Sequence, residues 1–296
     1  MSVILVAGGT GFLGSHIVQR LLQGGHRVMV LSRNPADLPP GVEGRPGDVR
    51  DQERLNKALQ GIQTLVIAVQ FPNAPVENPK KGLTYVKIDG EGTERLVKAA
   101  QQAGVKRLVY LSGAGAGEGR TEPWFIAKEM AERAVRTSGI PFTIIRPSWV
   151  YGPEDKSLNK FVTFARLLPF VPVVGNGRTK VQPVHVDDVA EAVARALEVP
   201  AAVNQTYGIG GPAALTMDQI IREMLQTMGK RRPLLHNPTW LMKLVTAPLT
   251  LLPTPPLSPA AVDFVVQEAP VDNGPLLRDL GLQLTPLAEG LGYLRS

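Results

Sequence analysis

Short apolar runs alternate with segments of helical period along most of the chain. The apolar runs, rich in β-branched and aliphatic residues, predict strands at 3–7, 27–32, 64–69, 107–112 and 142–146. Apolar residues that recur every three or four positions predict helices at 11–23, 51–59, 85–103, 122–138 and 187–197. This alternation is typical of a parallel sheet with helices on both faces. We therefore predict the α/β class, with a Rossmann-type doubly wound parallel sheet.

The C-terminal part of the chain has a different hydrophobic pattern and more prolines. From about Met217 onward, no strand alternation persists, and short helical pieces are separated by prolines at 233, 238, 248, 253, 255, 256 and 259. We predict a small, mainly helical C-terminal cap on the sheet. The most apolar stretch, 240–252, contains Lys243 and Pro248 and is too short to span a bilayer.

Composition excludes several function classes. The 296 residues include 32 Lys and Arg against 26 Asp and Glu, a net charge of +6, and the mean hydropathy of +0.01 is ordinary for a folded protein. The lack of cysteine excludes disulfides and thiolate metal sites. The basic clusters at 80–81 and 230–232 are small and have little aromatic interleaving, so we expect no nucleic-acid partner. No signal-peptide pattern precedes the first strand, which favours a cytoplasmic protein.

The strongest chemical signal is the motif GGTGFLG at 8–14, which follows the first predicted strand and opens the first predicted helix. Gly8 permits the tight turn, Gly11 lets backbone N–H groups approach a pyrophosphate, and Gly14 lets the helix pack on the strand. The motif predicts dinucleotide binding, and the alternative is a glycine-rich turn kept for packing alone. The predicted cofactor contacts in this turn are Gly8, Thr10, Gly11, Phe12, Leu13 and Gly14.

The end of the second predicted strand indicates which dinucleotide is bound. NAD needs a carboxylate there for its adenosine 2′-hydroxyl, and residues 31–34 contain none. Arg33 offers a planar fork suited to a 2′-phosphate, and Ser32 lies beside it, so we predict NADP(H) in preference to NAD(H). The alternative for Arg33 is a surface arginine that stacks on adenine. Asp48 and Val49 are predicted to meet the adenine edge, although Asp48 is equally suited to cap the next helix.

The glycine motif and the change in sequence pattern after about Met217 indicate the domain boundaries. Residues 1–150, completed by about 179–212, are predicted to form a dinucleotide-binding core. Residues 151–178 and 213–296 are predicted to form a smaller substrate or partner cap.

These features resemble the extended and atypical short-chain dehydrogenase/reductases over nearly the whole chain. Besides the glycines, the similarity rests on YLS at 110–112, RPSWVYGP at 146–153 and VHVDDV at 184–189. With GPED at 152–155 and LNKF at 158–161, the chain looks most similar to the nucleotide-binding accessory subunit of respiratory complex I and its bacterial relatives. The resemblance implies tight NADP(H) binding and, for several relatives, no demonstrated reaction.

The chain departs from the superfamily in its catalytic residues. Active members use a Tyr-x-x-x-Lys pair, in which the phenol moves the substrate proton and the lysine holds the nicotinamide ribose. In the matching register Trp124 stands at the tyrosine position and Lys128 is retained, while Ala114 stands where a Ser or Thr is usual. An indole N–H neither ionises near neutral pH nor accepts a proton. Lys128 is therefore the one catalytic candidate, should the protein be an enzyme.

The resemblance also implies further cofactor contacts. They are Val69, Gln70, Ser112, Lys128, Pro147, Ser148 and Val150. For Lys128 the alternative is a surface lysine paired with Glu132, and for Trp124 it is plain core burial instead of packing beside the nicotinamide. We expect no metal, because the group His185, Asp187 and Asp188 is better explained as the start of a helix.

Three functions remain open from sequence. The first is a catalytically silent dinucleotide-binding structural, sensor or assembly protein. The second is an NADPH-dependent oxidoreductase that uses Lys128 or water as proton donor on a small carbonyl or quinone-type substrate. The third places the protein in a protein complex or peripherally at the inner membrane, with the apolar stretch 240–245 on the membrane surface.

Overall fold

The structure is a computed structural model that describes residues 2–35, 38–71, 76–117, 119–248 and 270–295. In these ranges the central sheet has seven strands in the order β11-β6-β5-β4-β1-β2-β3, and all neighbouring strands are parallel. The strands are β1 (Val3–Ala7), β2 (Arg27–Ser32), β3 (Glu43–Pro46), β4 (Thr64–Ile67), β5 (Arg107–Leu111), β6 (Phe142–Pro147) and β11 (Gln205–Ile209). The predicted doubly wound α/β fold is confirmed.

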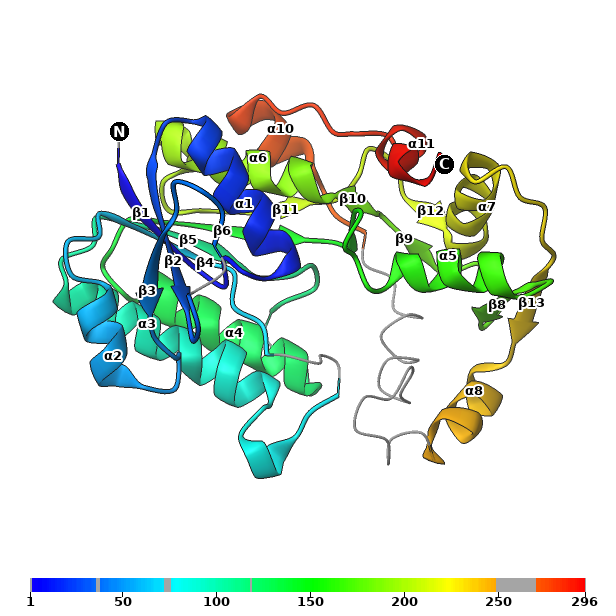
Figure 1. Ribbon diagram of the computed structural model, residues 1–296, viewed down its shortest axis with the longest axis horizontal. Helices are drawn as coiled ribbons and strands as arrows, with labels where there is room; N and C mark the ends of the chain where they lie inside the picture. The colour runs from blue at the N-terminus through cyan, green and yellow to red at the C-terminus, as the bar shows by residue number, and fades with distance from the viewer. Residues whose placement is uncertain (1, 36–37, 72–75, 118, 249–269, 296) are drawn as a thin grey trace.

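Helices cover both faces of the sheet (Figure 1). One face carries α1 (Phe12–Gln23), α6 (Val186–Glu198) and α10 (Gly274–Leu280), and the other carries α2 (Gln52–Ala58), α3 (Glu91–Gln102) and α4 (Pro123–Arg136). Successive side chains of one strand enter opposite cores, as Leu5 and Val6 do. Both are fully buried, which explains the continuous apolar runs.

The strand order reverses between β1 and β4. The chain moves from β1 to β2 and β3 on one side, and then returns to β4, β5 and β6 on the other. The connections on the two sides diverge at this point, and open α/β sheets bind their ligands at the carboxyl ends of the strands beside such a reversal. The glycine motif at 8–14 follows β1 and therefore lies at this position.

A smaller group of elements lies beyond one end of the sheet (Figure 1). Here β8 (Val171–Val174) pairs with β13 (Leu234–Asn237), and β9 (Lys180–Val181) pairs with β12 (Leu215–Thr216). An apolar cluster of its own joins these strands to the helices α5 (Leu158–Leu167), α7 (Met217–Thr227) and α11 (Leu287–Gly290). The short pair β7 (Val150–Tyr151) and β10 (Val184–His185) lies between this group and the sheet.

Three sequence predictions need correction. The expectation of no strands after Met217 is wrong, because β13 pairs in parallel with β8. Strand β11 was not predicted either, and it extends the sheet beside β6. The long helix expected at 85–103 is divided into a π-helical turn, η2 (Tyr85–Gly90), and α3.

The apolar stretch at 240–252 is described only in part. Helix α8 (Thr239–Thr246) covers its beginning, while 249–252 and the prolines at 253, 255, 256 and 259 lie outside the described residues. In the part of the chain that the structure describes, no helix has the length and apolar character needed to cross a membrane.

Candidate functional site

Packing of the chain itself requires glycine at three positions of the β1–α1 turn. Gly8 has a φ of +88°, and a Cβ there would lie 2.4 Å from the carbonyl oxygen of Ala68, at the end of β4. A Cβ at Gly14 would lie 2.0 Å from the carbonyl oxygen of Gly8, and one at Gly9 would lie 2.7 Å from a methyl of Val30. Close packing alone therefore accounts for these three glycines.

Gly11 differs from the other glycines of the turn. Its φ is −82°, which any residue adopts, and a Cβ there would come no closer than 3.3 Å to the carbonyl oxygen of Gly8. Gly11 is the N-cap of α1, and no side chain caps this helix. The first N–H groups of a helix lack partners within the helix and attract anions such as phosphate. An exposed glycine at this cap keeps the approach to those groups open.

The other predicted cofactor residues gather at the same edge of the sheet. Most of them follow the carboxyl ends of successive parallel strands: Ser32 and Arg33 on β2, Asp48 and Val49 on β3, Val69 and Gln70 on β4, Ser112 on β5, and Pro147 and Ser148 on β6. Val150 lies a little farther along, where β7 begins. Lys128 reaches this region from α4.

Arg33 and Asp48 lie near one another at the ends of β2 and β3. Arg33 is exposed, and its positive charge contributes to lowering the pKa of Asp48. The larger cause is Arg50, whose Nε and Nη2 donate to Asp48 at 3.0 and 2.6 Å. The suggestion that Asp48 caps the next helix is wrong, because Asp51 caps α2 by accepting from the backbone N–H of Arg54.

Lys128 is buried and faces a carboxylate that the sequence analysis did not single out. Its side chain is 6% exposed, and its Nζ lies 3.6 Å from Oδ1 of Asp89 and 3.5 Å from the carbonyl oxygen of Leu111. Asp89 itself is fully buried on η2, and its Oδ2 accepts from the backbone N–H of Phe71 at 3.0 Å. The alternative of a surface lysine paired with Glu132 is therefore wrong.

Glu132 instead forms a buried cluster with Ser112 and Arg146. It accepts from the Ser112 hydroxyl at 2.6 Å and from Nε and Nη2 of Arg146 at 2.8 and 2.7 Å, while Arg136 donates at 2.9 Å. Although burial disfavours its charge, the hydrogen bonds from Arg146 and Ser112 hold the pKa of Glu132 below the ordinary value. The arginine of the RPS motif and the hydroxyl of Ser112 thus fasten α4 to the ends of β5 and β6.

Trp124 and Ala114 occupy the region after β5. The Trp124 indole is half-buried and packs on Gly113, where a Cβ would lie 2.5 Å from two ring carbons. It also contacts Phe125 edge-on, with ring centroids 4.6 Å apart. The backbone N–H of Ala114 donates to the carbonyl oxygen of Pro147 at 2.8 Å. Residues 113–117 read GAGAG, so this loop carries no side-chain hydroxyl.

All five tyrosines of the chain have a raised pKa. Burial disfavours each phenolate, and nearby carboxylates add to the effect. The residues are Tyr85, Tyr110, Tyr151, Tyr207 and Tyr293, and for the last two the pKa is raised to about 12. A catalytic phenol needs the opposite shift, because it exchanges a proton near neutral pH.

The histidine and aspartates at 185–188 start helix α6. His185 is the N-cap and accepts from the backbone N–H of Asp187, whereas Asp188 accepts from the backbone and hydroxyl of Thr285 at 2.8 and 2.7 Å. The helix cap is therefore the histidine and not an aspartate. In the described ranges no three His, Cys, Asp or Glu side chains are grouped to hold a metal ion.

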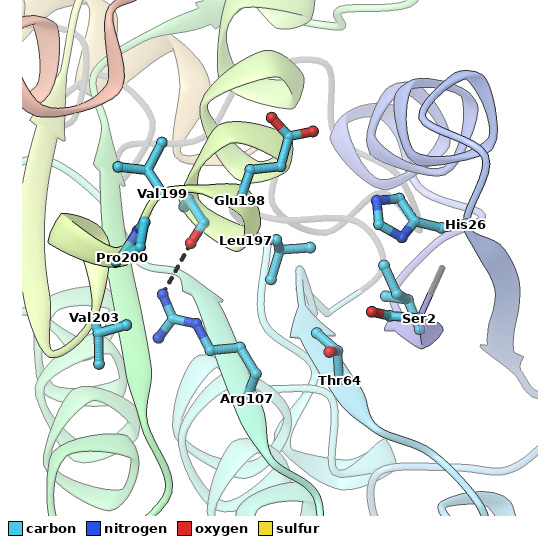
Figure 2. Close-up of a pocket in the computed structure, with 11 residues that line it drawn as sticks. Ser2, His26, Thr64, Arg107, Leu197, Glu198, Val199, Pro200 and Val203 are labelled. Carbon is cyan, nitrogen blue, oxygen red and sulfur yellow. Dashed lines mark hydrogen bonds between the residues drawn. The ribbon is translucent and has the colours of Figure 1, made fainter.

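Two hollows lie away from the carboxyl edge. One, of about 400 Å³, opens at the amino ends of the strands beside Thr64 and Arg107 (Figure 2). Arg107 donates to the carbonyl oxygen of Ala196 at 2.9 Å and so fastens the end of α6 to the sheet. The second, of about 600 Å³, lies in the smaller group beside Gly175 and His236. Neither hollow is lined by a predicted cofactor residue.

Comparison with known families places the chain among nucleotide-binding enzymes and their relatives. The model of the NAD dependent epimerase/dehydratase family matches residues 4–210, and the chain belongs to this family. The match begins at β1 and ends just after β11, so it covers the whole seven-stranded sheet.

The chain is similar to proteins named for large assemblies. One relative is the mitochondrial subunit 9 of the NADH dehydrogenase (ubiquinone) 1 alpha subcomplex of Arabidopsis thaliana, to which the chain is 30% identical over 257 residues. The alignment covers 83% of this chain and 63% of that protein. The chain thus spans less than two thirds of the length of this relative. It is also 28% identical over 247 residues to a photosystem II assembly factor of Trieres chinensis, covering 82% and 74%. The expected resemblance to a complex I subunit is confirmed.

Solved structures share the fold. The UDP-glucose 4-epimerase of Thermotoga maritima, solved with UDP-glucose, superposes with a TM-score of 0.78 at 22% identity, covering 99% of this chain and 97% of that one. At this identity the likeness shows the fold alone.

Asp89 is the main site residue that sequence reasoning missed. It lies in a segment read as one continuous helix, between Lys87 and Glu91, where an acid looks like an exposed position. The available signal was the pair of glycines at 90 and 92. A Cβ at Gly90 would lie 3.4 Å from the Cα of Ala127, so η2 packs closely on α4 and brings Asp89 to Lys128.

Proposed function

We propose that this chain is an NADP(H)-binding accessory protein, with a structural, sensing or assembly role, that does not itself turn over a substrate. The observation that carries this proposal is that no tyrosine is suited to act as the proton donor. Trp124 stands at the position of the family phenol, and every tyrosine of the chain has a raised pKa, so none is poised to exchange a proton.

The preference for NADP(H) over NAD(H) rests on Arg33. Arg33 is exposed after the end of β2, and Asp48, whose pKa it helps to lower, already accepts two hydrogen bonds from the side chain of Arg50. A 2′-phosphate beside Arg33 would gain a charged, bidentate partner. The 2′-hydroxyl of NAD would have to compete with Arg50 for the carboxylate of Asp48.

The test is a titration of nucleotide-stripped protein with NADPH and with NADH, followed by tryptophan fluorescence. We expect NADPH to bind much more tightly than NADH, and we expect no oxidation of NADPH above background with a panel of aldehydes, ketones and quinones. Equal affinities would remove the assignment of Arg33. Turnover of any carbonyl or quinone would instead favour the oxidoreductase alternative, with Lys128 or water as proton donor.

Helix α8 favours an additional role at an anionic membrane surface. Trp240 and Leu244, one helical turn apart, are 67% and 65% exposed, and Leu235 on β13 is 47% exposed. Residues 228–248 include four Lys or Arg and no Asp or Glu. Exposed tryptophan and leucine beside basic residues suit the interface of an anionic bilayer. The cap at 151–178 and 213–296 would then face the membrane, and a protein partner is the competing occupant.

Vesicle flotation tests this role. The protein should float with vesicles of phosphatidylglycerol and phosphatidylcholine but not with phosphatidylcholine alone, and a Trp240→Ser, Leu244→Ser double variant should stay in the soluble fraction. Val203→Ser, which changes an exposed apolar residue at the amino edge of the sheet, is the matched control and should float normally. Equal flotation of the double variant would contradict the membrane role and leave α8 to a protein partner.

A further inference from the structure

A buried polar cluster lies behind the candidate site, between η2, β5 and α4. Asp89 and Tyr110 are 0% and 1% exposed, and the ammonium of Lys128 lies 5.6 Å from the Tyr110 ring centroid. The Tyr110 hydroxyl has no hydrogen-bond partner among the described residues. A carboxylate and an ammonium in such a place are costly to bury, and removing either one leaves an uncompensated charge.

The contacts of Lys128 are long. Its Nζ lies 3.6 Å from Asp89 Oδ1 and 3.5 Å from the carbonyl oxygen of Leu111, at the outer limit of hydrogen bonding. An ammonium has three N–H donors, so these contacts leave it able to donate to a ribose hydroxyl. Asp89, in contrast, is fixed by the hydrogen bond from the backbone of Phe71.

We infer that Asp89 is a positioning residue: its carboxylate orients the Lys128 ammonium toward the dinucleotide, so that protonation of Asp89 weakens dinucleotide binding. This inference rests on the proposed function, because it assigns a pH dependence to the same dinucleotide site. When Asp89 is neutral, Lys128 loses its counter-charge inside the protein and is held only by the Leu111 carbonyl.

The groups that face Asp89 determine where it titrates. They are Lys128 from α4, Tyr110 from β5, Tyr85 from η2 itself, and Glu77 from the preceding segment. Burial raises the pKa of Asp89, the Lys128 charge and the Phe71 hydrogen bond lower it, and Glu77 raises it again, with the result at about 6. Protonation of Asp89 therefore falls within the range of a binding experiment.

The experiment measures the affinity for NADP⁺ and NAD⁺, which are stable in acid, between pH 5 and pH 8. If the form with neutral Asp89 binds much more weakly, the affinity falls about tenfold from pH 7 to pH 5. The 2′-phosphate of NADP⁺ also titrates near pH 6, so NAD⁺ and the Asp89→Asn variant separate the two groups. We expect the variant to bind both dinucleotides more weakly at pH 8 and to lose the pH step with NAD⁺, while Glu53→Gln on exposed α2 behaves as wild type.

Calorimetry of the wild-type protein provides a second readout if the variant fails to fold. NAD⁺ binding, which has no 2′-phosphate to titrate, should release protons when it is measured at pH 6 in two buffers of different ionisation enthalpy, because the bound form favours ionised Asp89, and at pH 8 it should release none. Proton uptake at pH 6, or an unchanged pH step in Asp89→Asn, would overturn the inference. If the wild-type protein binds neither dinucleotide at any pH, the proposed function itself fails, which is a distinct result.

Discussion

The indole of Trp124 packs so closely on Gly113 that a Cβ at position 113 would lie 2.5 Å from its ring. The contact links the first turn of α4 to the loop that leaves β5, at the edge where the dinucleotide is proposed to bind. The indole therefore fills the volume that a side chain on this loop would otherwise use. The ring of Trp124 and the absence of a side chain at Gly113 are therefore complementary in shape.

This contact predicts a specific loss of stability. Gly113→Ala should lower the free energy of unfolding by about 1–3 kcal/mol, as overpacking commonly does. In a Trp124→Ala background the same change should cost much less, because the colliding ring is gone. Urea unfolding of the two single variants and the double variant measures the coupling between the positions. Additive effects would mean that the ring moves aside freely.

The glycine turn predicts two opposite outcomes for the same substitution. Gly11→Ala should fold with a stability within about 1 kcal/mol of wild type, because its new methyl would meet only the carbonyl oxygen of Gly8, at 3.3 Å, and it should lose dinucleotide binding, because the methyl stands at the helix cap where the phosphates are proposed to bind. Gly14→Ala should be destabilised by about 3 kcal/mol or more, because its Cβ would meet backbone atoms that cannot move aside.

Thermal unfolding and fluorescence titration, run on both variants, distinguish the two roles. Retained binding in a folded Gly11→Ala variant would mean that the turn serves packing alone. A stable Gly14→Ala variant would show that the turn is looser than its contacts indicate.

The sheet could be predicted from sequence because strands that are buried on both faces are continuous apolar runs. Strands such as β1 and β2 are continuous apolar runs, and their helices repeat apolar residues at the helical period. Strand β13 leaves no such mark. It is four residues long, lies between two prolines, and exists because it pairs with β8 more than sixty residues away in the chain. Propensity does not report such a tertiary pairing.

Those parts of the candidate site that depend on backbone conformation could be predicted from the sequence. The side-chain pairings between different elements could not. The motif at 8–14 could be recognised as a tight turn because packing at Gly8, Gly9 and Gly14 admits only glycine. The partners of Lys128 depend on how η2 and α4 pack, and in place of the alternative pairing with Glu132 at i+4, Lys128 faces Asp89 on η2. Glu132 instead accepts hydrogen bonds from Arg146 and Ser112, which lie on other elements and cannot be predicted from helical spacing.

Arg33→Ala should change which dinucleotide is preferred. Loss of a charged hydrogen-bond partner costs about 1.5–3 kcal/mol, so the affinity for NADPH should fall about 10- to 100-fold while that for NADH changes little. Arg222→Ala on α7, in the smaller group of elements beyond the sheet, removes a comparable exposed arginine and should leave both affinities unchanged. Equal weakening of NADPH and NADH would show that Arg33 stacks on adenine and does not recognise the phosphate.

A phenol and a hydroxyl introduced at the positions proposed for the family's proton donors should not produce a reaction. In a Trp124→Tyr, Ala114→Ser variant the phenol and hydroxyl return, but the ammonium of Lys128 lies 3.6 Å from Asp89, which competes for the charge that would lower the phenol's pKa. We expect NADPH oxidation with a diverse carbonyl panel to remain at background. A clear gain of carbonyl reduction would show a surviving substrate pocket and contradict the accessory role.

The stability of the fold should depend on pH through Asp89, with a definite sign. Its pKa is raised from an ordinary value near 4 to about 6 in the folded protein, so between these values the folded state binds more protons than the unfolded state. The contribution of Asp89 is therefore greatest below pH 4 and is lost as the pH rises through 6. The difference in unfolding free energy between wild type and Asp89→Asn should shift by about 2–3 kcal/mol against the wild type from pH 4 to pH 7. Urea unfolding at half-unit pH intervals measures this difference, and a flat difference would mean that Asp89 titrates at its ordinary value.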